Sequence, residues 1–379
     1  MVKISAFKAL RPHDNLVEQV PTQAYSNYNK LEIEETKKNN QYSFLNIIHQ
    51  DNIDDQKKRF ESIKVQLGSF IDKAILIKED KPAIYVYTQT IKNMEFTGII
   101  CAIDLNDYKN QKIKVHEKTI EKRELLFAKY LSITKIYAEP VLITHDSNYA
   151  YTKHINKANL LYDFTTQDKV QHKIWKINEK KEIKKITNHF KNIEYLYIAD
   201  GHHRMASSSR VTDNNLCLAY ILPKKELQIY PFHRAVTTKY PSEDIINKIR
   251  QTTQVQYIKK PTKNSKNIEF YFQKKWYSVN TEIRKDALDN LLVNKLLNQI
   301  LKPIFNIKDE RNNKNIRFIS GTTATNEIIN DLKKNEILFI MNSININTII
   351  DIAHQNKTTP PKSTFILPKL PSGLIMMKL

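Results

Sequence analysis

The stretch from Ile193 to Leu222 constrains the fold of this chain more than any other segment. It reads IEYLYIADGHHRMASSSRVTDNNLCLAYIL, with an apolar run at each end and a polar centre. The aromatic and β-branched residues at 195–199 predict a strand, residues 205–210 predict a short helix, and residues 216–222 predict a second strand. An Asp-Gly pair marks the turn between the first strand and the helix. The stretch therefore predicts a β-loop-α-β unit within a mixed α/β fold.

The loop of this unit has the composition of an anion-binding site. The first turn of a helix leaves backbone N–H groups without intrahelical partners, and the helix dipole favours negative charge there. Gly201 lets the backbone approach an anion closely, while His202, His203 and Arg204 add donors and positive charge. Asp200 ends the first strand, where an open α/β sheet usually holds its ligand, and is available to a divalent metal. The residues alone thus predict a phosphate-handling site.

An ordinary polar turn is the alternative interpretation of the same loop, because Asp-Gly is a common turn pair. The chain has only 5 Gly in 379 residues, so a glycine at this position argues against a turn without a functional role. A zinc site at the adjacent histidines, 202 and 203, is a weaker hypothesis, since no cysteine or third histidine has ligand spacing.

The net charge of +20 raises the question of nucleic-acid binding. The excess is nearly all lysine, spread along the chain together with many Asn and Ile residues, as an AT-rich genome would produce. Arginine, which binds phosphate in a bidentate manner, is scarce. We therefore expect a small-molecule substrate rather than a specific nucleic-acid partner.

The cysteines and the N-terminus predict a cytoplasmic protein. Cys101 and Cys217 both fall in apolar strand-like runs, so we expect free thiols in a reducing compartment rather than a disulfide framework. The N-terminal sequence MVKISAFKALRP lacks the apolar segment of a signal peptide. No run of 18 apolar residues occurs, which predicts no membrane span.

The rest of the chain predicts alternating strands and helices. The expected strands cover residues 7–12, the run beginning SFL at 43–45, 83–91, 96–104, 138–144, 172–177, 268–272, 275–279 and 337–341. The expected helices cover 31–38, 54–68, the second half of 112–131 with Thr119 as N-cap, 179–190, 286–301, 327–333 and 346–354. A turn at Asn93 and Met94 predicts a hairpin. The amino-acid composition changes near residue 240, where lysine and asparagine become abundant. We therefore expect a core domain at 1–240 and a C-terminal α/β extension at 241–379.

Several segments together resemble a bacterial and archaeal family of domains of unknown function, sometimes labelled the HpaII family. The signature is ADGHHR at 199–204. Seven further blocks stand in family order: FKALRP at 7–12, SFL at 43–45, VHEKT at 115–119, HKIW at 172–175, PFHR at 231–234, KPIFNI at 302–307 and KSTFILPKLPSGL at 362–374. The resemblance covers nearly the whole chain. It implies a ParB/sulfiredoxin-like core with additional N- and C-terminal elaborations.

The same resemblance implies a function, because relatives include kinases of free L-serine. The chain would then be a phosphotransferase that converts L-serine to O-phosphoserine with ATP or ADP and Mg²⁺. Fold kinship implies this activity less strongly than it implies the fold. The alternatives are a nucleotide-binding, ParB-like regulatory protein associated with nucleic acid, or a catalytically silent family member. Sulfiredoxins carry a nucleophilic cysteine where this chain has His202, so thiol chemistry is not expected.

Phosphoryl transfer requires positioning, charge neutralisation and usually a metal. The candidate residues fall into three groups, each with a structural alternative. Asp200 is the expected magnesium ligand or hydroxyl-orienting group, and Glu117, beside His116, is the expected general base unless it only caps a helix. The expected phosphate-binding residues are Gly201, His202, His203, Arg204, Ser207, His233 and Arg234, with His203 also a catalytic candidate. The weaker pocket candidates are His116, His172, Trp175 and Lys362, while Ser363 and Lys369 are candidates to close over the site.

One departure from the family pattern bears on activity. Family members often carry a Tyr-Asp pair shortly after the first strand, whereas here Tyr25 is followed by Ser26, and Gln23 and Ala24 replace neighbouring prolines. If the missing acid takes part in catalysis, the protein is altered or inactive.

Overall fold

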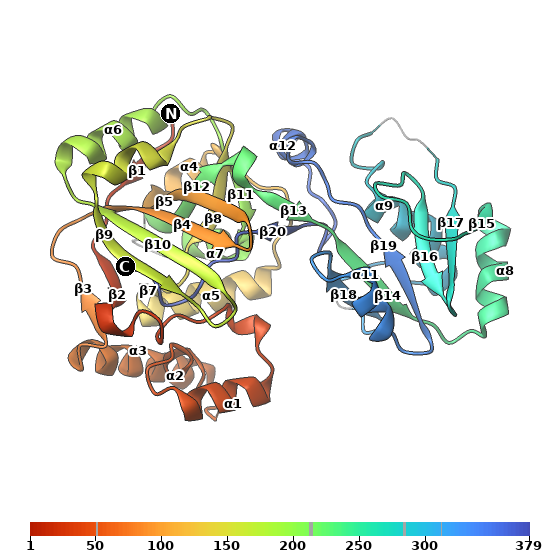
Figure 1. Ribbon diagram of the computed structural model, residues 1–379, viewed down its shortest axis with the longest axis horizontal. Helices are drawn as coiled ribbons and strands as arrows, with labels where there is room; N and C mark the ends of the chain where they lie inside the picture. The colour runs from red at the N-terminus through yellow and green to blue at the C-terminus, as the bar shows by residue number, and fades with distance from the viewer. Residues whose placement is uncertain (51, 212–214, 283–285, 312) are drawn as a thin grey trace. The chain divides into compact units, whose positions relative to one another are not determined.

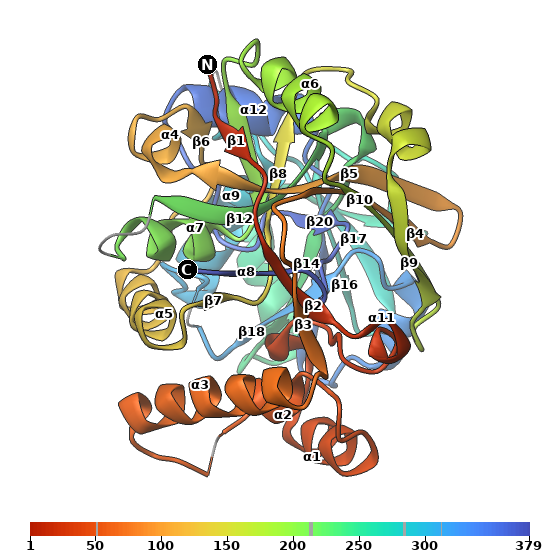
Figure 2. The ribbon, with the colours of Figure 1, turned by 90° about the vertical axis from the view of Figure 1, so that its left-hand side faces the viewer.

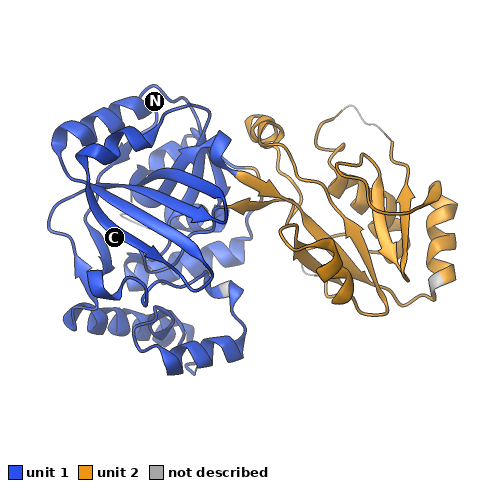
Figure 3. Ribbon diagram, in the orientation of Figure 1, with its two compact units in different colours: residues 1–115, 119–227, 368–379 blue, residues 116–118, 228–367 orange. Residues whose placement is uncertain are grey.

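The computed structural model describes residues 1–50, 52–211, 215–282, 286–311 and 313–379, without the side chains of Ser26 and Ser242. The described chain is a mixed α/β protein with several sheets. It forms two compact units, which Figure 3 distinguishes by colour. Unit 1 comprises Met1–Val115, Thr119–Leu227 and Pro368–Leu379, and unit 2 comprises His116–Lys118 and Gln228–Leu367. The domain division at residue 240 stays a prediction, and the C-terminal residues belong to the first compact unit.

The largest sheet lies in unit 1 and has the strand order β6-β11-β8-β12-β5-β4-β10-β9, with β1 paired to β5 (Figure 1). Its strands are β1 (Ile4–Ser5), β4 (Ile84–Ile91), β5 (Met94–Asp104), β6 (Ile113–Lys114), β8 (Val141–His145), β9 (Asn159–Thr165), β10 (Val170–Ile177), β11 (Leu196–Asp200) and β12 (Leu216–Pro223). The expected hairpin is confirmed, because β4 and β5 pair antiparallel up to Ile91 and Met94. Both cysteines are buried and free, Cys101 in β5 and Cys217 in β12.

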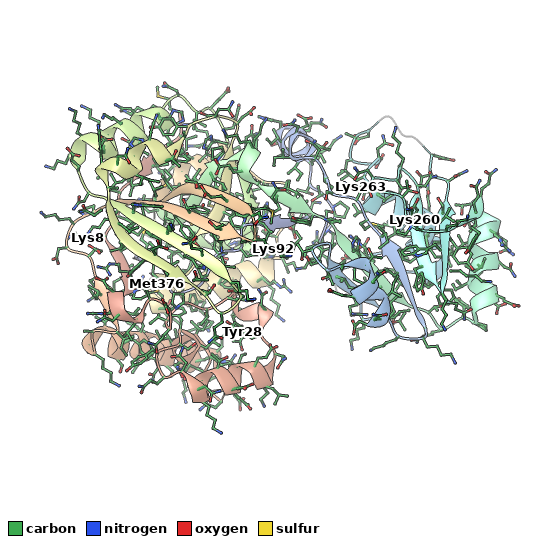
Figure 4. The ribbon with its side chains drawn as sticks, in the orientation of Figure 1. Lys8, Tyr28, Lys92, Lys260, Lys263 and Met376 are labelled. Carbon is green, nitrogen blue, oxygen red and sulfur yellow. The ribbon has the colours of Figure 1, made fainter. Side chains whose placement is uncertain are left out.

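A smaller sheet anchors the C-terminal segment in unit 1. Its order is β3-β2-β21-β7, formed by β2 (Ala9–Pro12), β3 (Leu76–Lys78), β7 (Ile136–Tyr137) and β21 (Met376–Lys378). Strand β21 lies between β2 and β7, and Met376, labelled in Figure 4, is fully buried against Phe44 and Leu76 in one core cluster. Burial of this strand holds the residues just before it close to the body of the unit.

Seven α-helices accompany the sheets of unit 1 in the described residues. They are α1 (Lys30–Asn39), α2 (Leu45–Ile48), α3 (Gln56–Asp72), α4 (Leu105–Lys109), α5 (Glu121–Thr134), α6 (Lys180–Phe190) and α7 (His202–Ser209), and Figure 2 shows α1, α2 and α3 together at one end. Short 3-10 turns cover Asp14–Leu16, Tyr25–Asn27, Tyr151–Lys157 and Lys224–Glu226. The expected strand at SFL is wrong, since Leu45–Ile48 is helical. Phe44, Leu45 and Ile47 are buried there, and so short an apolar run fits either structure.

Unit 2 contains an antiparallel sheet of order β15-β17-β16-β19-β14-β18 and the two-stranded pair β13-β20. The strands are β13 (Gln228–Tyr230), β14 (Phe232–Thr237), β15 (Val255–Ile258), β16 (Ile268–Phe272), β17 (Lys275–Val279), β18 (Ile316–Ser320), β19 (Glu336–Ile340) and β20 (Phe365–Leu367). The helices are α8 (Ser242–Thr252), α9 (Leu292–Leu296), η5, a π-helical turn (Leu297–Leu301), α10 (Lys302–Phe305), α11 (Thr325–Asn330) and α12 (Ile346–His354). Apolar side chains from the sheet and from α8, α9, η5, α10 and α12 form one core.

The expected helix at 286–301 is correct only in its second half. Residues 286–291 form turns, and α9 begins at Leu292. The carboxylate of Asp286 accepts the backbone N–H of Leu288, and the amide of Asn294 donates to the carbonyl of Leu288. Polar side chains that bond to the backbone in this way compete with helix formation. Residues 283–285, in the lysine- and asparagine-rich region that precedes it, lie outside the described residues.

No described helix is both long and apolar enough to span a bilayer.

Candidate active site

The site is organised by the junction between β11 and α7. The pairing of β11 with β8 shifts register between Ile198 and Asp200, so a bulge precedes the end of the strand. Gly201 follows with φ of 93°, in the left-handed region that L side chains rarely adopt. Helix α7 begins at His202, earlier than the expected start at Met205. The bulge and the glycine together place the Asp200 side chain beside the start of α7.

The predicted β-loop-α-β unit differs from a parallel crossover. Strand β8 lies between β11 and β12; it is antiparallel to β11 and parallel to β12. The two strands that flank α7 therefore run in opposite directions. Asp200 ends β11 as expected, in a mixed sheet where β11 is parallel to β6 and antiparallel to β8, and its role as a ligand-binding residue stays a prediction.

Two ion pairs from distant parts of the sequence meet around Asp200 and α7. The Lys369 ammonium lies 2.7 Å from the Asp200 carboxylate, and the Arg204 guanidinium pairs with Glu139. Arg204 also donates a hydrogen bond of 2.7 Å to the carbonyl of Pro140, and the Ser372 hydroxyl donates to Glu139 at 3.1 Å. These contacts lie within unit 1. The result is a cluster of two cations and two carboxylates at the start of a helix, which we call the charge cluster (Asp200, Arg204, Lys369 and Glu139).

The two carboxylates of the charge cluster have pKa values shifted in opposite directions. Partial burial would raise the pKa of Asp200, but the cations of Lys369 and Arg204 outweigh it and hold the pKa well below its ordinary value. Burial raises the pKa of Glu139 above its ordinary value, and the neighbouring Asp200 charge adds to this, although Arg204 opposes both. The lowered pKa favours the ionised form of Asp200, and the raised pKa makes Glu139 the better proton acceptor of the two.

The histidines of the motif are placed differently from each other. His202 is buried, and the Nε2 atom of His203 accepts a hydrogen bond of 3.0 Å from the backbone N–H of Ile120. Ile120 is the N-cap of α5, so a side chain of α7 supports the start of α5, against which α7 packs (Figure 2). The expected N-cap role of Thr119 is wrong, because its hydroxyl donates to the Glu124 carboxylate instead.

Ser207 and the predicted pocket residues of β10 are engaged within unit 1. The buried Ser207 hydroxyl donates to the carbonyl of His203, one turn earlier in α7. His172 is buried, stacks on Phe164 and lies 2.7 Å from the Tyr87 hydroxyl. Burial lowers the pKa of His172 to about 4, so the ring is neutral at physiological pH. Trp175 is half-buried and pairs with Val86 across the sheet.

The remaining predicted residues belong to unit 2. Arg234 is fully buried, where it pairs with Glu310 at 3.0 Å and donates to the carbonyl of Phe232. His233 is buried and accepts the backbone N–H of Met341 at Nδ1, and burial lowers its pKa to about 4.

Three other candidates also lie in unit 2. Glu117 forms an isolated backbone β-bridge with Thr359. The N–H and the hydroxyl of Thr359 both donate to the carbonyl of the buried His116. The Lys362 ammonium lies 5.0 Å from the centre of the Phe232 ring. The site roles of these residues and of His233 and Arg234 stay predictions.

Sequence reasoning missed two members of the site. Glu139 precedes a strand and Ser372 follows a proline, and neither stands in a pattern that marks chemistry. Lys369 was a candidate only because it falls in the block at 362–374. Long-range pairing of β21 with β2 and β7 brings this block to Asp200, and no local pattern specifies such pairing.

A resident metal centre is not built into the described residues, which contain no group of three or more His, Cys, Asp or Glu side chains able to hold an ion. Asp200 nonetheless suits a magnesium ion that arrives with a nucleotide, because Mg²⁺ commonly uses one or two carboxylates together with phosphate oxygens and water. Its side chain is 41% exposed, and each carboxylate oxygen has a lone pair beyond its present contact with Gly201 or Lys369.

The fold and the charge cluster define a mixed α/β protein in which two ion pairs gather at the start of a helix. The chain belongs to the family described as "Protein of unknown function (DUF1015)", whose model matches residues 4–298. The match ends before Lys369 and Ser372, so part of the charge cluster lies beyond the matched residues.

The chain is similar to several solved structures. One is a free serine kinase in complex with AMP, at 13% identity and a TM-score of 0.41, covering 74% of this chain and 91% of that one. A C-terminally truncated SbnI from Staphylococcus aureus has 10% identity and a TM-score of 0.41, covering 71% and 82%. A conserved hypothetical protein from Pyrococcus furiosus has 13% identity and a TM-score of 0.38, covering 74% and 94%. No curated protein matches the chain.

Proposed function

We propose that this protein is a nucleotide-dependent phosphotransferase whose acceptor is a small hydroxyl amino acid, with free L-serine as the first candidate. The observation that carries the proposal is the convergence of Asp200, Arg204 and Lys369 at the glycine-initiated start of α7. A helix start with two cations favours phosphate, and a carboxylate beside them favours a phosphate-bound metal. The ADGHHR block resembles a family whose relatives include kinases of free L-serine, and this directs the proposal to serine.

Arg204, Asp200 and Gly201 each have a part in the proposed reaction. Arg204, held by Glu139 and the Pro140 carbonyl, presents its guanidinium in a fixed orientation to the phosphates of ATP or ADP. Asp200 holds one position of a nucleotide-borne Mg²⁺ ion, which would neutralise phosphate charge when bound. Gly201 lets the backbone lie close to the phosphates. A Cβ atom at this position would lie 3.0 Å from the Arg204 side chain.

The transfer requires a proton acceptor for the serine hydroxyl. The hydroxyl oxygen forms a bond to the terminal phosphorus, the bond from that phosphorus to the nucleotide oxygen breaks, and the hydroxyl proton passes to a base. Glu139 suits this role because it belongs to the charge cluster and its pKa is raised by burial. The expectation from the sequence that Glu117 is the base stays a prediction.

A direct assay tests the proposed function. The full chain is incubated with Mg²⁺, ATP or ADP, and L-serine, L-threonine or glycine, and phosphorylated products are measured by mass spectrometry. Phosphoserine above a protein-free blank, with no phosphorylated product from glycine, is the expected result. Absence of any phosphorylated amino acid with both nucleotides, in folded protein, contradicts the proposal.

One sequence observation favours a second candidate function. Ser26 replaces the acid that family members often carry after Tyr25, which favours a nucleotide-binding member without transfer activity. The side chain of Ser26 lies outside the described residues. Nucleotide binding by equilibrium dialysis without phosphoserine formation would identify this function.

A further inference from the structure

The C-terminal segment of unit 1, residues 368–379, is fixed at its backbone while one of its side chains reaches the charge cluster. The Gln89 amide donates to the carbonyl of Lys369 at 3.0 Å, and Ser372 exchanges backbone hydrogen bonds with Thr22. The Gly373 N–H donates to the carbonyl of Ala138 at 2.9 Å, and β21 follows directly. Lys369 therefore has a fixed point of attachment from which its flexible side chain extends to Asp200.

The two cations of the charge cluster are held differently. Arg204 is bound by a carboxylate and by a backbone carbonyl, and 23% of its side chain is exposed. Lys369 meets Asp200 through a partly exposed ammonium, with 38% of its side chain accessible. A lysine ammonium is a compact point charge on a four-carbon stem, so it changes partner at little cost, whereas a two-sided arginine contact is specific in geometry.

Asp200 faces two competing demands. One carboxylate oxygen accepts the Gly201 N–H at 2.8 Å, and the other accepts the Lys369 ammonium at 2.7 Å. A divalent cation that approaches the second oxygen would meet the lysine charge at the same place, and like charges this close repel. The metal and the ammonium thus compete for Asp200.

Phosphate groups offer the displaced ammonium a new partner. In the free protein the charge cluster is neutral, with one cation for each carboxylate. A nucleotide with its metal adds net negative charge, which a cation released from its internal partner would help to stabilise. Lys369 is the cation whose release the same metal would cause.

We propose that Lys369 is a switching residue, which occupies Asp200 in the free protein and transfers to the nucleotide phosphates when a divalent metal takes its place. This inference rests on the proposed nucleotide-dependent function. It makes the C-terminal segment, which lies beyond the residues matched by the family model, a working part of the phosphate site.

The test uses Lys369→Met and Lys369→Arg in the full chain, with Lys8→Met as the matched control. Lys8 is an exposed lysine of the same unit and is labelled in Figure 4. Two dissociation constants are measured for each protein: that of Mn²⁺ without nucleotide, by electron paramagnetic resonance, and that of ATP and ADP, by equilibrium dialysis with Mg²⁺. Thermal melting checks that each variant is folded.

The switching role predicts effects of opposite sign. Lys369→Met binds Mn²⁺ about fivefold more tightly, because the competing charge is gone, and binds nucleotide about tenfold more weakly, because a phosphate partner is gone. Lys369→Arg recovers most of the nucleotide affinity, and Lys8→Met matches the parent protein in both measurements. A lysine that only neutralised Asp200 would tighten Mn²⁺ binding when removed but would leave the nucleotide affinity unchanged.

Three results would overturn the inference. Unchanged nucleotide affinity in Lys369→Met, with a parent protein that binds nucleotide, removes Lys369 from the site and leaves the proposed function intact. Weaker binding of both Mn²⁺ and nucleotide assigns Lys369 a structural role. A parent protein that binds neither ATP nor ADP overturns the proposed function, and this inference with it.

Discussion

The ammonium of Lys369 lies 2.7 Å from the carboxylate of Asp200, although 169 positions separate the two residues in the sequence. Asp200 ends strand β11, and Lys369 precedes strand β21, which pairs in a different sheet of the same unit. The contact joins the ADGHHR segment at 199–204 to the C-terminal segment. It also couples the chemistry of the site to the packing of that segment.

The pair between Arg204 and Glu139 should contribute measurably to stability. We expect a double-mutant cycle with Arg204→Met and Glu139→Gln to give a coupling free energy of about 1–2 kcal/mol, because the pair is charge-assisted and partly shielded from solvent. Urea denaturation of the four proteins measures it. The exposed pair of Lys57 and Glu61 in α3 serves as the control, with an expected coupling of at most about 0.5 kcal/mol. Equal coupling in both cycles would remove the special status of the site pair.

Gly201 should be intolerant of a side chain. Its φ of 93° disfavours an L residue, and a Cβ atom would lie 3.0 Å from the Arg204 guanidinium. We expect Gly201→Ala to lower the free energy of unfolding by about 1–2 kcal/mol and to weaken nucleotide binding. Gly68→Ala in helix α3 is the control, since no atom lies within 4 Å of its added Cβ; it should stabilise by up to about 1 kcal/mol. Neutral behaviour of Gly201→Ala would argue against the described geometry.

Arg234 distinguishes a structural from a ligand-binding role in unit 2. Its guanidinium is fully buried against Glu310, so Arg234→Met should cost about 3–5 kcal/mol of unfolding free energy by leaving a buried carboxylate unpaired. The double variant Arg234→Met with Glu310→Met should recover much of this loss. If the refolded double variant also keeps nucleotide affinity, measured by equilibrium dialysis, Arg234 is structural; a selective loss of affinity would restore the predicted phosphate contact.

Buried histidines should make the fold sensitive to acid. Burial lowers the pKa of His172 from its ordinary value of 6.5 to about 4, so the unfolded chain binds a proton there at a higher pH than the folded chain does. The stability contributed by the neutral ring is therefore complete above pH 6.5 and is lost as the pH falls from 6.5 towards 4, by up to about 3 kcal/mol. Urea denaturation across this range should show a smaller decline for His172→Asn than for the parent protein. Identical slopes would contradict the assignment.

Much of the local structure could be predicted from the sequence because local patterns specify it. The alternating residues of β4 and β5 around a short turn predicted their hairpin, and the strands on both sides of α7 were also predicted. The prediction failed at Leu45–Ile48, where four apolar-rich residues fit a strand as well as a helical turn. It failed again at Asp286, whose side chain bonds to the backbone in place of a helix.

The candidate site was predictable only in its continuous part. The run from Asp200 to Arg204 carries a turn, donors and charge within five positions, so the sequence alone marks it as a candidate site. Glu139 and Ser372 reach the site through pairing between strands far apart in the chain, which no periodicity encodes. The direction of β12 relative to β11 was also beyond prediction, because an intervening strand from elsewhere in the sequence decides it.

Phosphorus NMR of the full chain with Mg²⁺, L-serine and either ATP or ADP tests the central claim most directly. The parent protein and Lys8→Met should produce an O-phosphoserine resonance at equal rates, and Asp200→Asn should produce at most a small fraction of it. A parent protein that is folded yet gives no phosphoserine with either nucleotide would contradict the proposed phosphotransferase. Equal production by Asp200→Asn would contradict the placement of the reaction at the start of α7.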